Sequence, residues 1–184
     1  MGDRRLQALV SGLRSPVYLL MELEMRAVVQ RVRRAAVNVG ERAVAQIGPG
    51  LVIFVGVGKE DGEDEIGWMA EKIAHLRVFE DVEGRMDRSL LEIGGQALVV
   101  SQFTLYGDVR KGRRPDFTAA AGSAEAEPIY QRFVRDLRGR GVPVQSGVFG
   151  ARMLVEIEND GPVTLIVETP DRRHQSISGP RTED

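Results

Sequence analysis

Ala97-Leu98-Val99-Val100-Ser101-Gln102-Phe103-Thr104 is the most informative stretch of this chain. Its first half is a continuous apolar run, which is typical of a strand that is buried on both faces. Its second half places two hydroxyls, an amide and an aromatic ring directly after that strand. The sequence therefore predicts a buried strand that delivers hydrogen-bonding groups to one edge of a sheet.

Apolar patterns on either side of this stretch predict a mixture of strands and helices. Residues at helical spacing predict one amphipathic helix from about Glu63 to Val78 and another from about Ser123 to Arg138. Gly139 follows the second segment and is suited to ending a helix. Further strands are expected at Ala27–Val32, Ala35–Val39, Ala43–Ile47, Leu51–Val55, Met153–Ile157 and Leu165–Val167.

A second polar segment, Asn159-Asp160-Gly161-Pro162-Val163-Thr164, lies between the last two expected strands. Neither this segment nor Ser101–Thr104 contains histidine, cysteine or a cluster of carboxylates. Any chemistry at these two segments must therefore use main-chain groups and hydroxyls. From the residues alone, the ordinary interpretation of Ser101 and Thr104 is that they cap a turn at the end of the strand.

The length and composition of the chain predict one domain with flanking tails. Its 184 residues are enough to bury a hydrophobic core, and its formal net charge of -2 does not by itself suggest a nucleic-acid partner. We expect residues 1–24 to be an N-terminal extension outside the domain and residues 25–169 to form the domain. Residues 170–184 are expected to be a disordered polar tail.

Several kinds of chemistry are disfavoured by what the sequence lacks. The absence of cysteine excludes disulfides and thiolate chemistry and is compatible with a cytoplasmic location. No apolar run approaches the ~18 residues that a membrane-spanning helix requires, so no membrane partner is expected. His75 and His174 lack metal-ligand spacing, and no phosphate-binding glycine loop, nucleophile elbow or Ser-His-Asp set is evident. We therefore expect no metal and no cofactor, and we interpret His75 as a packed or surface helix residue.

A basic loop follows the first polar segment directly. The stretch from Val109 to Phe117 is expected to be either a nucleic-acid contact or a solvated loop. Cations beside an aromatic ring suit phosphate contacts next to a base-stacking surface. The adjacency of this loop to Ser101–Thr104 favours the functional interpretation. The four cations are Arg110, Lys111, Arg113 and Arg114.

Four segments together resemble the D-aminoacyl-tRNA deacylase (D-tyrosyl-tRNA deacylase) family. They occur in the family's order and extend the likeness from Met25 to about Glu168. The resemblance implies a barrel-like or sandwich-like β-sheet core with two main flanking helices. The segments are Met25–Val32, Ser101–Asp108, Gly147–Met153 and Asn159–Thr164.

The resemblance also implies an activity. Members of this family are homodimers that hydrolyse the ester joining a D-amino acid, or glycine wrongly attached to a tRNA, to the terminal adenosine. This activity serves quality control in translation, and its partner is the 3′ end of aminoacyl-tRNA. The family uses no cofactor, and its active site lies at the subunit interface.

The resemblance assigns roles to residues of this chain. It implies that main-chain N–H groups of Phe103 and Thr104 stabilise the oxyanion, while a substrate 2′-hydroxyl helps to activate water. It also implies that a cis Gly161-Pro162 peptide enters the partner's pocket and excludes an L side chain. The basic loop would contact tRNA. The catalytic pocket would be formed by Ser101, Gln102, Phe103 and Thr104, with support from Phe149, Asn159 and Thr164.

Two other functions remain open on the sequence alone. One is a dimeric RNA-binding module without catalysis. The other is an esterase or peptidase that acts on small D-configured compounds. Retained tRNA binding without turnover would favour the first, and equal turnover of a free D-amino acid ester would favour the second.

Overall fold

Strand β6 (Gln96–Ser101) lies between β3 (Gly50–Gly56) and β7 (Val144–Ser146) in a six-stranded sheet, and it runs parallel to both neighbours. The computed structural model describes residues 25–170. Residues 97–100 are buried, as expected for a strand covered on both faces. The expected N-terminal extension, and the expected tail beyond residue 170, fall outside the described residues.

The longest strands are β1 (Arg26–Val39) and β8 (Leu154–Glu168), which pair in antiparallel fashion. Across its other edge, β1 pairs with β3 along its first half and with β2 (Arg42–Ile47) along its second half. The sheet curls toward a barrel, because β2 also contacts β6 and β7. The expected α/β fold, with a barrel-like sheet and two main helices, is confirmed.

The sequence divided β1 and β8 into two strands each, and this division is wrong. Gln30 pairs with Thr164 and Val32 pairs with Asn159, so residues 160–163 stand opposite the single residue Arg31. The extra residues bulge out of the ladder without ending it. Polar residues and a Gly-Pro pair therefore interrupt the apolar pattern of β8 while the strand continues.

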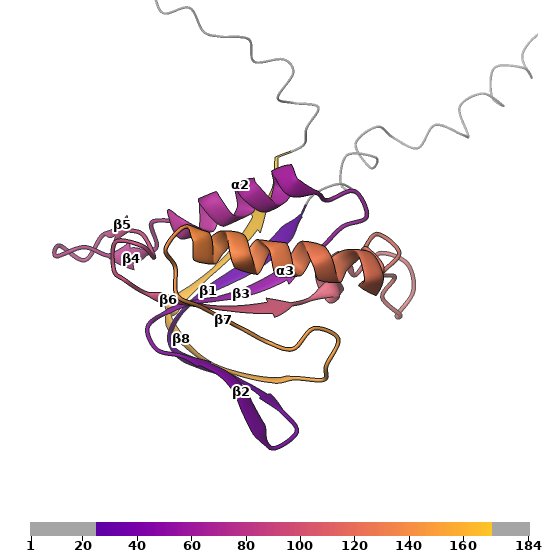
Figure 1. Cartoon of the computed structure of the whole chain (residues 1–184), viewed down its shortest axis with the longest axis horizontal. Coiled ribbons are helices and arrows are strands. Elements are labelled where there is room, and N and C mark those ends of the chain that lie inside the picture. The colour runs from indigo at the N-terminus through magenta and orange to yellow at the C-terminus, as the bar shows by residue number, and fades with distance from the viewer. Residues whose placement is uncertain (1–24, 171–184) are drawn as a thin grey trace, which may run out of the picture.

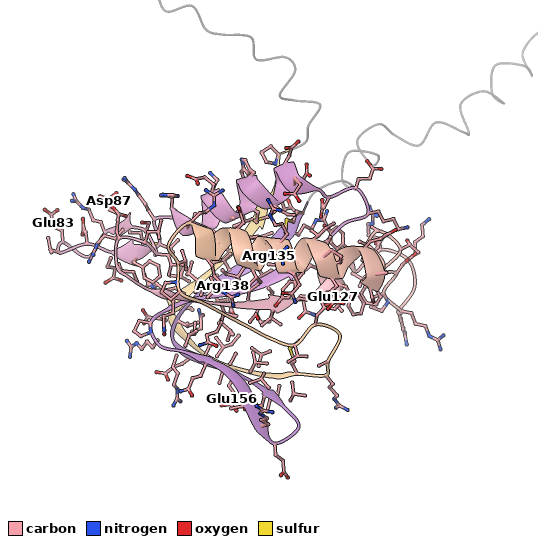
Figure 2. All side chains as sticks on the ribbon, in the orientation of Figure 1. Glu83, Asp87, Glu127, Arg135, Arg138 and Glu156 are labelled. Carbon is pink, nitrogen blue, oxygen red and sulfur yellow. The ribbon has the colours of Figure 1, made fainter. Side chains whose placement is uncertain are left out.

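Helices α2 (Glu63–Ala74) and α3 (Ser123–Gly139) cover one face of the sheet (Figure 1). The core between them and the sheet includes the fully buried Tyr130 and Phe133 of α3. The opposite side of α3 is charged, with Glu127, Arg135 and Arg138 exposed (Figure 2). None of the described helices is long and apolar enough to cross a membrane.

Helix α2 ends at Ala74, whereas the apolar spacing predicted an end at Val78. Beyond the helix, the Val78 side chain is buried and its carbonyl accepts a hydrogen bond from Arg31 Nη1 at 2.7 Å. Residues 76–78 have no regular secondary structure, and the Val78 N–H donates to the Leu76 carbonyl at 3.1 Å instead of to a carbonyl four residues earlier. His75 caps α2 and is exposed, which agrees with its interpretation as a helix-surface residue.

Short elements complete the fold. Strands β4 (Phe79–Glu80) and β5 (Met86–Arg88) form a small hairpin beside the helices (Figure 1). A 3-10 helix, η1 (Phe103–Tyr106), follows β6. The sequence predicted none of these, nor β7, because two to four residues are too few to establish a periodicity.

The start of β3 should be intolerant of any side chain. A Cβ at Gly50 would overlap the main chain of Gln96, whereas a Cβ at Gly67 within α2 would meet no atom. We expect Gly50→Ala to lower the free energy of unfolding by about 1–3 kcal/mol, as overpacking does. The control Gly67→Ala should raise it by about 0.5–1 kcal/mol, because alanine favours the helix. Urea denaturation measures both, and equal effects would contradict this account of the strand contact.

Candidate functional site

A cavity of about 670 Å³ opens beside the end of β6. Ser101, Gln102 and Phe103, which the family resemblance assigned to a catalytic pocket, form one wall. A second wall comes from the loop before α3, and a third from the segment before β8 and the start of that strand. The complete lining is Val57, Val100, Ser101, Gln102, Phe103, Phe117, Ala120, Ala121, Gly122, Ser123, Ala126, Phe149, Gly150, Ala151, Met153 and Val155.

None of these lining residues carries an ionisable side chain. The cavity therefore offers no imidazole, thiol or carboxylate that could act as a general base or nucleophile. Hydroxyls, an amide and main-chain groups are the polar atoms that remain. This composition agrees with the expectation that chemistry at Ser101–Thr104 uses main-chain groups.

Thr104 lies next to this wall and is exposed, but its hydroxyl is not paired with a base. The side-chain amide of Gln102 donates a hydrogen bond to Thr104 Oγ1. The amide N–H occupies a lone pair of the hydroxyl oxygen and cannot accept the hydroxyl proton. This contact therefore does not activate Thr104 as a nucleophile.

The main chain of this segment is held at both ends. The Gln102 N–H donates to the Val55 carbonyl at 2.8 Å, which joins the segment to β3. Within η1 the first amide to donate is that of Leu105, to the Gln102 carbonyl at 3.3 Å. In such a turn the preceding amides, those of Phe103 and Thr104, have no partner within the helix.

An aromatic pair stands at the mouth of the cavity. Phe103 is 57 % exposed, and its ring meets that of Phe117 edge to face, with ring centroids 5.1 Å apart. An exposed large aromatic ring costs hydrophobic free energy unless it serves contact with another molecule. The exposed Phe103 ring, supported by Phe117, is an apolar face of the kind on which nucleobases stack.

The basic loop connects η1 with Phe117, which lines the cavity. Reciprocal main-chain hydrogen bonds between Asp108 and Asp116, at 2.7 and 2.9 Å, close its base. Arg110 forms a bidentate ion pair with Asp108, and this hydrogen-bonded contact lowers the pKa of Asp108 far below its usual value. The other three cations, Lys111, Arg113 and Arg114, are exposed and form no ion pair within residues 25–170.

Gly161 and Pro162 do not line the cavity of their own chain. They are exposed at the bulge of β8, and the peptide bond between them is cis. Two further residues that the sequence assigned to the pocket hold this bulge. Asn159 Nδ2 donates to the carbonyls of Arg31 and Val163 at 2.8 and 3.1 Å, while Thr164 Oγ1 accepts from Gln30 at 3.1 Å. Of the predicted supports, Phe149 alone lines the cavity.

Arg31 organises the bulge, and the sequence patterns did not single it out. Its side chain is 6 % exposed, and its Nε lies 3.3 Å from both the Asp160 carbonyl and Asp160 Oδ2. Arg31 lies on the same buried face of β1 as Ala27 and Val29, two residues apart along the strand. A cation at an apolar position of this alternating pattern was therefore the sequence feature that could have indicated its role.

The chain matches a family of known sequences over the whole of this fold. The family model described as D-Tyr-tRNA(Tyr) deacylase matches residues 28–168. The chain is 57 % identical over 148 residues to a D-aminoacyl-tRNA deacylase of Thermus aquaticus, a match that covers 80 % of this chain and 97 % of the relative. It is 57 % identical over 145 residues to the D-aminoacyl-tRNA deacylase of Symbiobacterium thermophilum, covering 79 % and 96 %.

Two solved structures have a similar fold. One is the c-Myc DNA Unwinding Element Binding Protein, with a TM-score of 0.76 and 44 % identity over 79 % of this chain and 99 % of that one. The other is a probable eukaryotic D-amino acid tRNA deacylase, with a TM-score of 0.71 and 22 % identity over 80 % and 100 %. At that identity the second likeness shows the fold alone.

The bulge of β8 should require glycine at position 161. Its φ of +112° is a conformation that L residues rarely adopt, and a Cβ there would lie 2.7 Å from Arg31 Nη2. We expect Gly161→Ala to lower the free energy of unfolding by about 1–3 kcal/mol, and by more than Gly112→Ala. Gly112 is the matched control, because its φ is +72° but a Cβ there meets nothing. Equal decreases in urea denaturation would show that contact with Arg31 does not matter.

Proposed function

We propose a substrate selectivity for this chain, which belongs to the D-aminoacyl-tRNA deacylase family and is a hydrolase of the aminoacyl-tRNA ester bond. It removes D-amino acids and wrongly attached glycine from tRNA while sparing L-aminoacyl-tRNA. The observation that carries this proposal is the cavity beside Ser101–Thr104, which lacks ionisable side chains. Such a site suits an ester, whose hydrolysis needs a positioned water and an oxyanion contact more than a strong protein nucleophile. We place this activity in the cytoplasm, where translation takes place.

In the proposed reaction a water oxygen attacks the ester carbonyl carbon. The main-chain N–H groups of Phe103 and Thr104 stabilise the negative charge that develops on the carbonyl oxygen. The substrate 2′-hydroxyl helps to activate the water, since the lining supplies no base. The bond to the 3′-oxygen then breaks, and that oxygen leaves with a proton. The products are a free amino acid and a tRNA with a 3′-hydroxyl.

Chiral selection is proposed to come from a second copy of the chain. Gly161 and Pro162 are exposed and lie outside their own cavity, so they are available to enter the cavity of a partner. A wall of main-chain atoms there excludes an L side chain sterically, while a D side chain points away from it. Exposed apolar residues of β8 support a homodimer, because Leu154 is 63 % and Ile166 is 74 % exposed.

The tRNA end is proposed to lie across the aromatic pair and the basic loop. The exposed ring of Phe103, which Phe117 contacts edge to face, offers a stacking surface in the cavity lining. The exposed cations Lys111, Arg113 and Arg114 supply phosphate contacts, whereas Arg110 is engaged by Asp108.

Nucleic-acid binding without catalysis is the second candidate function. One structural neighbour, 44 % identical to this chain, is named for binding a DNA unwinding element. A protein with this function would retain binding but show no ester hydrolysis. An esterase for small D-configured compounds would instead hydrolyse free D-amino acid esters as readily as charged tRNA.

The deciding experiment compares hydrolysis of D- and L-tyrosyl-tRNA. We expect the wild-type protein to release D-tyrosine and to leave L-tyrosyl-tRNA intact. Thr104→Ala should retain measurable turnover, because Thr104 is not the nucleophile, and a D-substrate without the terminal 2′-hydroxyl should react poorly. A covalent aminoacyl adduct on Thr104 in a quenched reaction would overturn the water mechanism. Absence of D-tyrosine release would overturn the proposed function.

The basic loop should determine the salt dependence of tRNA binding. Replacing Lys111, Arg113 or Arg114 with glutamine should reduce the log–log slope of affinity against salt by roughly one unit for each phosphate that is no longer neutralised. Arg110→Gln is the matched control and should change the slope less, since its guanidinium already pairs with Asp108. Filter binding at several salt concentrations measures the slopes. An unchanged slope in the triple variant would identify the segment as a solvated loop.

A further inference from the structure

A buried carboxylate lies just outside the cavity and belongs to none of the roles described so far. Asp61 is in the turn between β3 and α2, and the residue is 7 % exposed. One of its oxygens, Oδ2, accepts a hydrogen bond from the Gly58 N–H at 2.6 Å. Removing a charge from water is costly, so a buried carboxylate needs compensating contacts.

The same oxygen reaches the segment that carries Phe103 and Thr104. The Tyr106 hydroxyl lies 3.4 Å from Asp61 Oδ2 and donates to it. Tyr106 is the last residue of η1, and it is 4 % exposed. The guanidinium of Arg26 lies over the Tyr106 ring at 5.1 Å from its centroid. The end of η1 is therefore fixed by a ring that is held on its face and at its hydroxyl.

The space around Tyr106 is fully used. A Cβ at Gly56 would lie 3.0 Å from the Tyr106 ring, and a Cβ at Gly58 would lie 3.0 Å from its hydroxyl. The two glycines thus allow the end of β3 to approach η1 closely. Burial, followed by the negative charge of Asp61, raises the pKa of Tyr106 well above its usual value. The hydroxyl therefore remains a hydrogen-bond donor across the neutral range.

The turn that Asp61 closes also holds a second wall of the cavity. Gly58 forms an antiparallel bridge with Ala120, and the Ala121 N–H donates to the Val57 carbonyl at 2.9 Å. Val57, Ala120 and Ala121 all line the cavity. Asp61 Oδ2 thus links, through Gly58 and through Tyr106, two walls that come from distant parts of the sequence.

We propose that Asp61 is a positioning residue that sets the separation between the Phe103–Thr104 wall and the Ala120–Ala121 wall. This assignment rests on the proposed deacylation. Main-chain donors stabilise an oxyanion only when they are held at the correct place, and a displacement of about 1 Å can cost as much as 100-fold in rate. A catalytic side chain is positioned by its rotamer. Main-chain groups are positioned by the contacts that hold the backbone, so in this cavity those contacts determine where the donors lie.

The test compares Asp61→Ala, Asp61→Asn and Tyr106→Phe in steady-state hydrolysis of D-tyrosyl-tRNA, with thermal unfolding measured in parallel. Asp61→Ala should lower kcat by about 10- to 100-fold. Its KM should change less, because phosphate contacts elsewhere supply most of the affinity for tRNA. Asp61→Asn should restore most of kcat, since a single amide oxygen can accept from both Gly58 and Tyr106.

Tyr106→Phe tests the same link by a milder change if Asp61→Ala does not fold. It should lower kcat by about 2- to 10-fold, the factor equivalent to one hydrogen bond. The matched control is Tyr130→Phe, which removes another buried hydroxyl, one that donates to the Val99 carbonyl at 2.9 Å. Its kcat should stay near that of the wild type.

The outcomes separate this assignment from the proposed function. An active wild type whose Tyr106→Phe variant keeps full kcat overturns the assignment alone. Equal decreases of kcat in Tyr106→Phe and Tyr130→Phe also overturn it, because they would show that losing any buried hydroxyl lowers activity through a loss of stability. A wild type without turnover overturns the assignment together with the proposed function.

Discussion

The buried guanidinium of Arg31 needs hydrogen-bond and ion-pair partners, and these partners come from several parts of the fold. Arg31 lies on the apolar face of β1, where an unpaired cation would be strongly unfavourable. It donates to the Val78 carbonyl and pairs with Asp160, so it joins β1 to the chain after α2 and to the bulge of β8. Its carbonyl partner Val78 lies just beyond the end of α2, and a Cβ at Gly161 would lie 2.7 Å from Arg31 Nη2.

The buried charges of Arg31 and Asp61 lie outside the lining of the cavity. The cavity lining has no ionisable side chain, while Arg31 and Asp61 lie behind main-chain segments that they hold in place. Parallel strands β3 and β6 end at the same edge, which brings Val57 and Ser101 together. These two charged side chains thus contact the main chain, and the polar groups that line the cavity are amides and hydroxyls.

The regular elements could be predicted from the sequence, because burial of one helix face and of both faces of β6 leaves a periodic pattern. The pocket role of Ser101, Gln102, Phe103 and Phe149 came instead from the family resemblance, since the residues alone suggested only a capped turn after β6, and the structure places all four in the lining of the cavity. The continuity of β1 and β8 could not be predicted, since bulges depend on pairing between distant segments. Contacts across the fold also decided the roles of Asn159 and Arg31, and single-residue types do not reveal such partners.

The composition of the cavity has a consequence for chemical probes. Reagents that modify thiols, imidazoles or carboxylates would find no target among its lining residues. A small molecule directed at this site has to gain its affinity from shape and from hydrogen bonds to the backbone. The backbone hydrogen bonds would survive most side-chain replacements, because an amide donor is present whichever residue occupies the position, with proline as the exception.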